Sequence, residues 1–476
     1  MFVKRFYEPK LAQASYLIGC QSEKEAIVID PNRDAEQYVA EAEAQGVEIK
    51  HVTETHIHAD YLSGSRELAQ RTGATLYLSD EGDDSWKYGF SSDAGVKLIN
   101  DGDRITVGNI LIDAVHTPGH TPEHLVFLVT DGAGADEPIA VASGDFIFVG
   151  DVGRPDLLER AAKILGTMDV SARQLYASLQ KFSGQPDWLQ VWPGHGAGSA
   201  CGKGISAIPH STMGYERRFN WAFQTKTEQE FVDAVLAGQP EPPKYFAEMK
   251  RLNKEGPRVL GGFSKPEHLG AGAFASHLGA GALIVDTRPA AEFAVGHVPG
   301  TINIPLNGSF TTWAGWIVPF TQDFYLIGDD QQVEAAARDL AMIGLDRVGG
   351  FFTSEVIEAY ADAGQMLGSI PQIVVGDLKE SLARGGVTLV DVRNQNEWNG
   401  GYIDGATHIP LGYLTDRLDE IPRQKPIVVQ CAAGGRSSIA ASLLMANGVD
   451  QAINLVGGIG AWRAAELPTT DAVPVA

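Results

Sequence analysis

Short apolar runs alternate with longer amphipathic stretches through the first half of the chain. The run Ala26–Ile29, stopped by Pro31, predicts a strand, and residues 34–45, closed by Gly46, predict a helix. Further strands are predicted at residues 49–53, 111–115, 125–130, 139–143 and 189–192. Strands that alternate with helices are typical of a layered α/β fold whose polar chemistry lies at the ends of the strands.

The pattern changes near residue 227. Residues 227–253 are helical and charged, and Thr227 with Glu230 predicts a capping box that opens this stretch. The stretch breaks at Gly256 and Pro257. We therefore place a first domain at residues 1–255.

The rest of the chain contains an internal repeat. Residues 286–288 (Asp-Thr-Arg) match residues 391–393 (Asp-Val-Arg), and at the same offset of 105 residues an Ile-Pro-Leu triplet at 304–306 recurs at 409–411. So many special residues at one offset predict two related α/β domains. We place them at residues 256–365 and 366–476.

Composition narrows the possible partners. The formal net charge of −23 over 476 residues argues against nucleic acid and anionic membranes, because their phosphates would be repelled. No stretch approaches the roughly 20 continuous apolar residues of a membrane span, and the first residues hold no signal-peptide core. A cytoplasmic location is therefore expected. The three cysteines, Cys20, Cys201 and Cys431, are too few for a disulfide framework, so each is a candidate free thiol.

Four short segments of the first domain contain histidine or aspartate after a predicted strand. They are His56-Ile-His58-Ala-Asp60-Tyr61, Thr117-Pro-Gly-His120, Ser143-Gly-Asp145 and Pro193-Gly-His195. A single histidine is more often an ordinary core or surface residue than a ligand. All four segments in this order predict a metal site.

These segments resemble the signature of the metallo-β-lactamase superfamily, which is HxHxDH followed by His, Asp and His on later loops. The resemblance covers residues 1 to about 225 and implies an αββα sandwich with the metal at the edge of its two sheets. Most dinuclear zinc members have histidine where this chain has Tyr61. A phenol with a reference pKa of ~10 is a poor zinc ligand, so a single metal is expected.

Within that superfamily the chain resembles the persulfide dioxygenase branch, which implies one Fe(II) per chain held by His56, His120 and Asp145. Two imidazoles and one carboxylate leave open positions on Fe(II) for O2 and a substrate sulfur. The same resemblance implies that His58, Asp60 and His195 orient the ligands or bound water.

Three further residues of this domain have two readings each. Arg154 belongs to a segment that resembles the same branch, and a buried loop salt bridge is the alternative. Cys201 follows His195 by six residues and is either a small buried side chain or a carrier of sulfur near the iron. Lys203 could bind the carboxylate of a substrate. Cys20, in an apolar strand, is expected in the core.

A second constellation lies in the last domain. The apolar strand 427–430 leads into Cys431-Ala-Ala-Gly-Gly-Arg436, and a helix follows from about residue 439. A cysteine between a strand and a helix N-terminus meets free backbone N–H groups and the positive end of the helix dipole. This environment favours the thiolate, and Arg436 adds positive charge.

The loop and its surroundings resemble the rhodanese family of sulfurtransferases over residues 370–465. That resemblance implies catalytic roles for Cys431, Arg436, Asp391 and Arg393, with a persulfide carried on the cysteine. Related phosphatases have a C-x5-R loop, whereas this chain has C-x4-R, which favours sulfur transfer.

The first repeat, residues 256–365 (the Cys-less repeat), has Gly328-Asp-Asp where the last domain (the Cys431 repeat) has its cysteine loop. Two acidic residues would repel a thiolate and an anionic acceptor. We expect this repeat to be an inactive rhodanese fold that holds the active domains in register.

Together these features predict an α/β protein made of a metallo-β-lactamase sandwich and two rhodanese domains. The expected function is oxidation of a low-molecular-weight thiol persulfide by O2 to sulfite, coupled to sulfur transfer by Cys431 that yields thiosulfate. A homo-oligomer is expected. The alternatives are a zinc thioester hydrolase resembling glyoxalase II and a non-enzymatic sulfur carrier that uses only Cys431.

Overall fold

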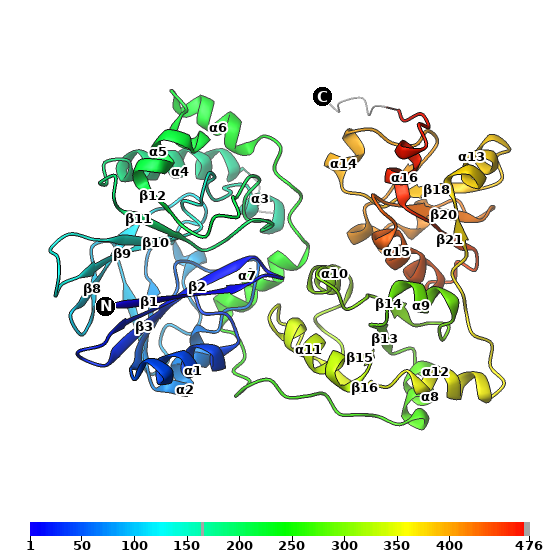
Figure 1. The fold of residues 1–476 in the computed structure, drawn as a ribbon, viewed down its shortest axis with the longest axis horizontal. Helices are drawn as coiled ribbons and strands as arrows, with labels where there is room; N and C mark the ends of the chain where they lie inside the picture. The colour runs from blue at the N-terminus through cyan, green and yellow to red at the C-terminus, as the bar shows by residue number, and fades with distance from the viewer. Residues whose placement is uncertain (163–165, 471–476) are drawn as a thin grey trace. The chain divides into compact units, whose positions relative to one another are not determined.

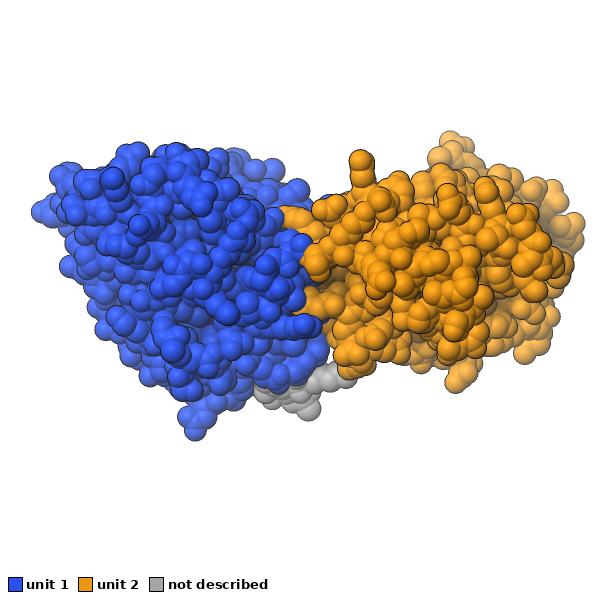
Figure 2. Space-filling model, turned by 90° about the horizontal axis from the view of Figure 1, so that it is seen from below, with its two compact units in different colours: residues 1–263, 341–344 blue, residues 264–340, 345–476 orange. Residues whose placement is uncertain are grey.

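The computed structural model describes residues 1–162 and 166–470. It separates into two compact units, of which the first contains residues 1–263 and 341–344 and the second contains the remainder (Figure 2). The first unit therefore extends beyond the predicted boundary at residue 255. Most of both repeats lies in the second unit, whereas residues 256–263 and 341–344 of the Cys-less repeat belong to the first. Among the described residues no helix combines the length and the apolar character that crossing a membrane requires.

Two six-stranded sheets form the first unit (Figure 1). One sheet has the order β1-β2-β3-β4-β5-β6, built from Phe2–Glu8, Gln13–Cys20, Glu25–Ile29, Glu48–Thr53, Thr75–Ser79 and Val96–Ile99. The other has the order β12-β11-β10-β9-β8-β7, built from Ser211–Thr212, Gln190–Pro193, Ala140–Gly144, Leu125–Asp131, Ile110–His116 and Arg104–Val107.

Helices cover the outer face of each sheet. The helices of this unit are α1 (Ala35–Gln45), α2 (Ser65–Thr72), α3 (Leu157–Ala162), α4 (Met168–Phe182), α5 (Met213–Phe219), α6 (Glu228–Leu236) and α7 (Tyr245–Glu255). Apolar residues of α1 and α2 pack on the first sheet, and those of α4, α5 and α6 pack on the second.

Alternation along the strands produces three apolar layers. In β3, Ile27 and Ile29 join the cluster between the sheets, whereas Val28 joins the cluster beneath α1 and α2. In β9, Phe127 faces the other sheet and Val126 faces α4. Because successive side chains of a strand point to opposite faces, a strand that is covered on both sides is apolar throughout. This is the expected αββα sandwich.

The helical stretch predicted at residues 227–253 is two helices, α6 and α7. The Thr227 hydroxyl accepts a hydrogen bond from the Glu230 N–H at 3.1 Å, as expected for an N-cap. The Glu230 carboxylate accepts from the N–H of Lys226 rather than from that of Thr227. The capping box is thus formed with its second half displaced by one residue.

The second unit contains two parallel sheets. The Cys-less repeat has the order β14-β13-β15-β16, built from Ile302–Asn303, Leu283–Asp286, Phe324–Ile327 and Val348–Phe352. The Cys431 repeat has the order β17-β21-β20-β18-β19, built from Gln372–Ile373, Ala452–Leu455, Ile427–Gln430, Thr388–Asp391 and Thr407–His408.

The α-helices of the two repeats correspond except for α10, which has no α-helical counterpart among the described residues of the Cys431 repeat, and one loop differs. The helices are α8 (Ala271–Gly279), α9 (Ala290–Val295), α10 (Phe310–Ile317), α11 (Asp330–Ala341) and α12 (Glu355–Asp362), then α13 (Val375–Ala383), α14 (Gln395–Asn399), α15 (Gly435–Ala446) and α16 (Gly458–Ala464). Residues 328–329 join β15 to α11, whereas residues 431–434 join β20 to α15. The loop that carries the cysteine is therefore the longer one.

Candidate metal centre and thiolate loop

Three side chains from three strand ends meet in the first unit. His56 follows β4 of the first sheet, His120 follows β8 of the second, and Asp145 directly follows β10. One ligand atom from each lies within 4.8 Å of the other two, and all three residues are buried. The predicted metal ligands are therefore brought together at the edge that both sheets share.

The two imidazoles have fixed orientations. The Thr55 hydroxyl donates to Asp30 Oδ2 at 2.9 Å, so it accepts from the Nδ1–H of His56, also at 2.9 Å. The Nδ1–H of His120 donates to the carbonyl of Arg154 at 3.0 Å, because a carbonyl can only accept. Each ring is thereby held as the tautomer whose Nε2 carries a free lone pair.

The donor atoms of this group suit a metal ion. Nε2 of His56 and both carboxylate oxygens of Asp145 are buried without a hydrogen-bond partner among the described residues. Burial lowers the pKa of both His56 and His120, and the neighbouring histidines lower that of His56 further, so both rings are neutral, as ligands must be. Buried polar atoms without partners are costly unless something binds them. Two imidazoles and a carboxylate can hold either iron or zinc.

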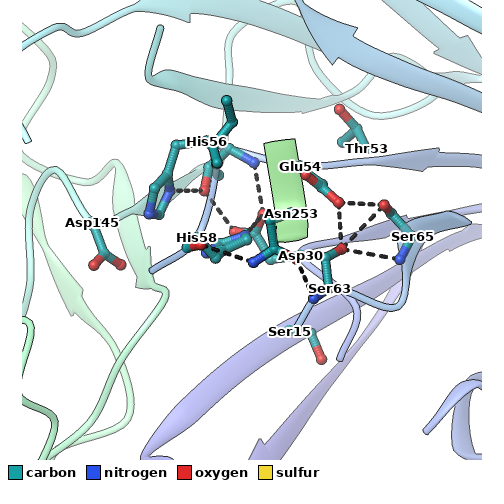
Figure 3. A network of polar contacts seen from close by, with 12 residues as sticks. Ser15, Asp30, Thr53, Glu54, His56, His58, Ser63, Ser65, Asp145 and Asn253 are labelled. Atoms are coloured by element: carbon teal, nitrogen blue, oxygen red, sulfur yellow. Dashed lines mark hydrogen bonds and ion pairs between the residues drawn. The ribbon is translucent and has the colours of Figure 1, made fainter. Parts of the chain in front are cut away.

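A polar network supports the first histidine segment (Figure 3). Nε2 of His58 lies 3.1 Å from Asp30 Oδ1, and Asp30 also accepts from the N–H of Thr55 at 2.6 Å. Burial alone would lower the pKa of His58, but the Asp30 carboxylate raises it to about 9. His58 is therefore a cation paired with Asp30 and lies outside the group of three ligands. The sequence analysis missed Asp30, whose signal is an acidic residue at the end of a buried strand.

Tyr61 occupies the place where most dinuclear relatives have histidine. Its side chain is 1% exposed, and its hydroxyl donates to the carbonyl of Asp30 at 3.3 Å. Burial, together with the charges of Asp30 and Asp60, raises the pKa of the phenol well above 10. A phenol that keeps its proton is not an anionic ligand, which agrees with the expectation from the sequence.

A second buried group lies beside the first. Asp60, His195 and Cys201 each offer one ligand atom, and these atoms are within 4.8 Å of one another. Nε2 of His195 lies 3.2 Å from Asp60 Oδ2 and 3.3 Å from Asp145 Oδ1. Burial, with the charges of Asp60 and Asp145, raises the pKa of the Cys201 thiol well above 9. Cys201 is thus a buried neutral thiol adjacent to the candidate metal ligands.

Arg154 and Lys203 make structural contacts. The Arg154 guanidinium forms a two-point ion pair with Asp156 at 2.8–2.9 Å, fully buried, and donates to the carbonyl of Ala200. This pair holds the loop whose carbonyl orients His120. The Lys203 ammonium donates to carbonyls at the end of α6, including that of Ala237 at 3.1 Å. These contacts do not test its predicted role toward a substrate carboxylate, which stays a prediction.

Three more buried residues of this domain are Cys20, Glu123 and His124. Cys20 is 3% exposed in the core between the sheets, as expected. His124 and Glu123 were missed by the sequence analysis. Nε2 of His124 accepts from the N–H of Asp145 at 3.1 Å, and Glu123 accepts from the N–H of Ile57 at 2.8 Å. Both lie close after His120 in the sequence, which is the signal that could have found them.

In the second unit Cys431 stands between β20 and α15. Its Sγ accepts hydrogen bonds from the N–H of Gly434 at 3.1 Å and from the Ser437 hydroxyl at 3.4 Å. These donors at a helix N-terminus stabilise negative charge on the sulfur. The helix α16 also stabilises the loop, because the Ile459 N–H donates to the Cys431 carbonyl at 2.8 Å.

The charged site residues predicted in this domain take part in two ion pairs. Both terminal nitrogens of Arg436 lie 2.6 Å from the Glu397 carboxylate. Arg393 pairs with Asp391 and donates to the carbonyls of Glu397 and Gly401 at 3.0 Å. Among the described residues, neither Asp391 nor Arg393 bonds the sulfur of Cys431. Their contacts brace the backbone that presents Glu397, a residue the sequence analysis missed.

Family models match both parts of the chain. The model of the metallo-beta-lactamase superfamily matches residues 9–195, and the rhodanese-like domain model matches residues 271–349 and 374–465. A crystal structure of a metallo-beta-lactamase from Staphylococcus aureus is 42% identical, with a TM-score of 0.67, and the match covers 74% of this chain and 99% of that one.

Two curated proteins are similar to the first domain at nearly equal identity. Hydroxyacylglutathione hydrolase from Rhodospirillum rubrum is 29% identical over 38% of this chain and 60% of its own length. The mitochondrial persulfide dioxygenase ETHE1 from Bos taurus is 27% identical over 35% of this chain and 60% of its own length. Identity alone does not choose between a hydrolase and a dioxygenase.

Proposed function

The chain belongs to the metallo-β-lactamase superfamily and carries two rhodanese-like domains, and we propose that it is a persulfide dioxygenase fused to a sulfurtransferase. The substrate is a low-molecular-weight thiol persulfide, R–S–SH. Its outer sulfur is oxidised by O2 to sulfite in the first domain, and Cys431 supplies a second sulfane sulfur that converts sulfite to thiosulfate.

The observation that carries the proposal is the donor set of His56, His120 and Asp145 beside a protonated Tyr61. Two neutral imidazoles and one carboxylate on one side of an ion leave its other positions free for two reactants. Fe(II) held there would supply the redox chemistry with O2 that zinc lacks. The likeness to the bovine persulfide dioxygenase supports the same assignment.

The oxidation balances with water as the further reactant. The outer sulfur of R–S–SH gains both oxygen atoms of O2 and one from water, the S–S bond breaks, and R–SH, sulfite and two protons are released. Thr55 and the Arg154 carbonyl keep the imidazoles of His56 and His120 oriented during this reaction. The carboxylate of Asp60 and the imidazole of His195 are buried polar groups beside the candidate ligand Asp145.

Sulfur transfer needs no redox partner. The Cys431 thiolate attacks the outer sulfur of a second persulfide, a new S–S bond forms, and R–S⁻ leaves. Sulfite then attacks the outer sulfur of the Cys431 persulfide, which releases thiosulfate and a proton and restores the thiolate. Hydrogen bonds from Gly434 and Ser437 stabilise the sulfur anion in both states.

Substitution of one metal ligand tests the proposal. We expect His120→Ala to abolish iron binding and persulfide-dependent O2 uptake, because the group loses one of its Nε2 donors. Transfer of sulfur from thiosulfate to cyanide by Cys431 should remain at the wild-type rate. His210→Ala, which changes an exposed histidine of the same domain, is the matched control and should alter neither activity. Wild-type O2 uptake in His120→Ala would refute the iron site.

A zinc-dependent thioester hydrolase is the second candidate. The adjacent group of Asp60, His195 and Cys201 favours it, because that group could hold a second ion, and the likeness to hydroxyacylglutathione hydrolase agrees. Metal analysis of the purified protein separates the candidates. One iron per chain with O2 uptake supports the dioxygenase, whereas two zinc ions per chain with hydrolysis of a glutathione thioester supports the hydrolase.

A further inference from the structure

The second unit contains a cavity that both repeats line. Its volume is about 680 Å³, and Cys431 and Arg436 lie on its wall. Residues 432, 433, 435 and 439 of the same repeat also line it, and the opposite repeat, which lacks a cysteine, contributes residues 305–307, Trp313 and Gln332 among others. The repeat that lacks a cysteine is therefore part of the surroundings of the reactive one.

Packing between the repeats fixes this wall. The helix α15, which begins beside Cys431, packs on β14 and α9 of the Cys-less repeat. The N–H of Asn303 donates to the hydroxyl of Ser442 at 3.0 Å, and both residues are fully buried. Trp316 and Tyr413 also make an edge-to-face ring contact at 5.5 Å. A buried hydrogen bond of this kind fixes the position of one repeat against the other, because leaving either group unpaired costs about 1–3 kcal/mol.

The size of the cavity fits an organic substrate. Pockets of about 300–1,000 Å³ are typical of small-molecule sites, and thiosulfate or sulfite would fill only a small part of this one. The wall combines apolar surface from Pro305, Leu306 and Trp313 with the neutral amides of Asn307 and Gln332. This is a surface for the organic half of R–S–SH rather than for an inorganic anion.

Charge leads to the same conclusion. Apart from the reactive sulfur of Cys431, Arg436 is the one charged side chain among the described residues that line the cavity, and Glu397 pairs with it at two points. The pair is close to neutral overall, so the wall does not select for a dianion. The indole N–H of Trp313 and the side-chain amides of Asn307 and Gln332 keep N–H donors that bond no other described residue. Such donors can bind the carbonyl oxygens of a ligand amide.

We propose that the Cys-less repeat selects the sulfur donor of the Cys431 reaction. Its side of the cavity, the specificity wall, binds the organic half of an amide-bearing thiol persulfide through Trp313 and Gln332. The inference rests on the proposed role of Cys431 as a persulfide acceptor. The Cys431 thiolate takes the outer sulfur and R–S⁻ leaves, as in the step above, while the amide chain of R stays against the wall.

The test compares two sulfur donors with the full-length protein under anaerobic conditions, so that no persulfide is oxidised. The persulfide of N-acetylcysteine amide carries two neutral amides and is paired with sulfite, and thiosulfate is paired with cyanide. We expect Trp313→Ala and Gln332→Ala to raise the KM for the amide persulfide about five- to tenfold, as for contact residues of binding sites elsewhere. The KM for thiosulfate should stay within about twofold, which also reports an intact fold.

The chain provides a matched control for this comparison. Gln331 precedes Gln332 on α11, is exposed and does not line the cavity, so Gln331→Ala should change neither KM. If Trp313→Ala and Gln332→Ala change both donors equally, or change neither, the specificity wall is refuted. Mass spectrometry of Cys431 after exposure to the donor separates a failure of the specificity wall from a failure of the proposed sulfur transfer itself. Absence of a persulfide on Cys431 would overturn the proposed function of this domain itself.

A second variant tests the charge argument. Glu397→Gln keeps an acceptor at this position but leaves the charge of Arg436 uncompensated. We expect the KM for thiosulfate to fall severalfold while the KM for the amide persulfide changes less. An unchanged KM for thiosulfate would contradict the view that Glu397 masks this arginine.

Discussion

At the scale of single residues, one substitution distinguishes this site from those of dinuclear relatives. Tyr61 stands where most of those relatives have histidine, and its phenol keeps its proton because burial raises its pKa well above 10. Asp60 and His195 nevertheless remain in place beside Cys201. The second metal position has therefore lost one strong ligand while keeping the others.

We predict that restoring histidine at this position changes metal stoichiometry. Tyr61→His, purified with excess zinc, should bind about two ions per chain where the wild type binds about one, because an imidazole joins Asp60 and His195. Elemental analysis measures the ratio, and Tyr61→Phe is the control that should stay at the wild-type value. A wild type that already holds two zinc ions would contradict the single-metal proposal.

A second prediction concerns the fully buried pair of Arg154 and Asp156. Asp156→Asn leaves a buried guanidinium without its counter-charge, and this should lower the free energy of unfolding by about 3–5 kcal/mol. Chemical denaturation measures the loss. The matched control is Asp169→Asn, which removes an exposed partner of Arg173 and should leave the free energy of unfolding nearly unchanged. Equal losses in both variants would show that burial of the pair does not matter.

At the scale of elements, the thiolate loop depends on α16 as well as on the strand and helix that flank it. Gly458, the first residue of α16, has φ of +55°, and a Cβ there would lie 2.2 Å from the Cys431 carbonyl oxygen. The close approach lets Ile459 and Gly460 donate their N–H groups to the loop carbonyls. Glycine at this position is what allows α16 to hold the loop.

Gly458→Ala should therefore destabilise the protein and slow sulfur transfer. We expect a loss of about 1–3 kcal/mol from overpacking, together with a lower kcat for sulfur transfer because the loop must shift. Gly376→Ala on α13 is the control, since a Cβ there meets nothing within 4 Å. That control should be neutral or stabilising by up to about 1 kcal/mol. Normal kcat in Gly458→Ala would show that the loop does not need α16.

At the scale of the whole molecule, the two chemistries lie in separate compact units. The candidate metal ligands belong to the first unit, and Cys431 with its cavity belongs to the second. Sulfite is therefore the intermediate that the proposed function requires to pass from one unit to the other. Removing one activity should leave the other intact.

Cys431→Ser tests this modular arrangement. We expect O2 uptake with persulfide to continue at the wild-type rate, because Cys431 and the candidate metal ligands belong to different units, while sulfite accumulates in place of thiosulfate. Chromatographic analysis of the two sulfur anions measures the shift. An unchanged yield of thiosulfate would refute the role of Cys431, and a loss of O2 uptake would refute the independence of the two units.

Much of the site follows from sequence because strand ends are local features. Histidine or aspartate after a predicted strand indicated His56, His120, Asp145 and His195, and the structure gathers them at one edge. Asp30 and Glu397 were not found in this way. Each acts through long-range hydrogen bonds or ion pairs, and nothing in its local sequence marks its partners.

The sequence by itself predicted a layered α/β fold and an internal repeat, because apolar periodicity and repeated motifs are local features. Its resemblance to known families implied the αββα sandwich, the rhodanese fold and the candidate site residues. Tertiary structure decided which imidazole nitrogen is free, that His58 pairs with Asp30, and that Arg436 is neutralised. It also decided that the Cys-less repeat lines the cavity of Cys431. These depend on distances between segments far apart in the chain, which only packing fixes.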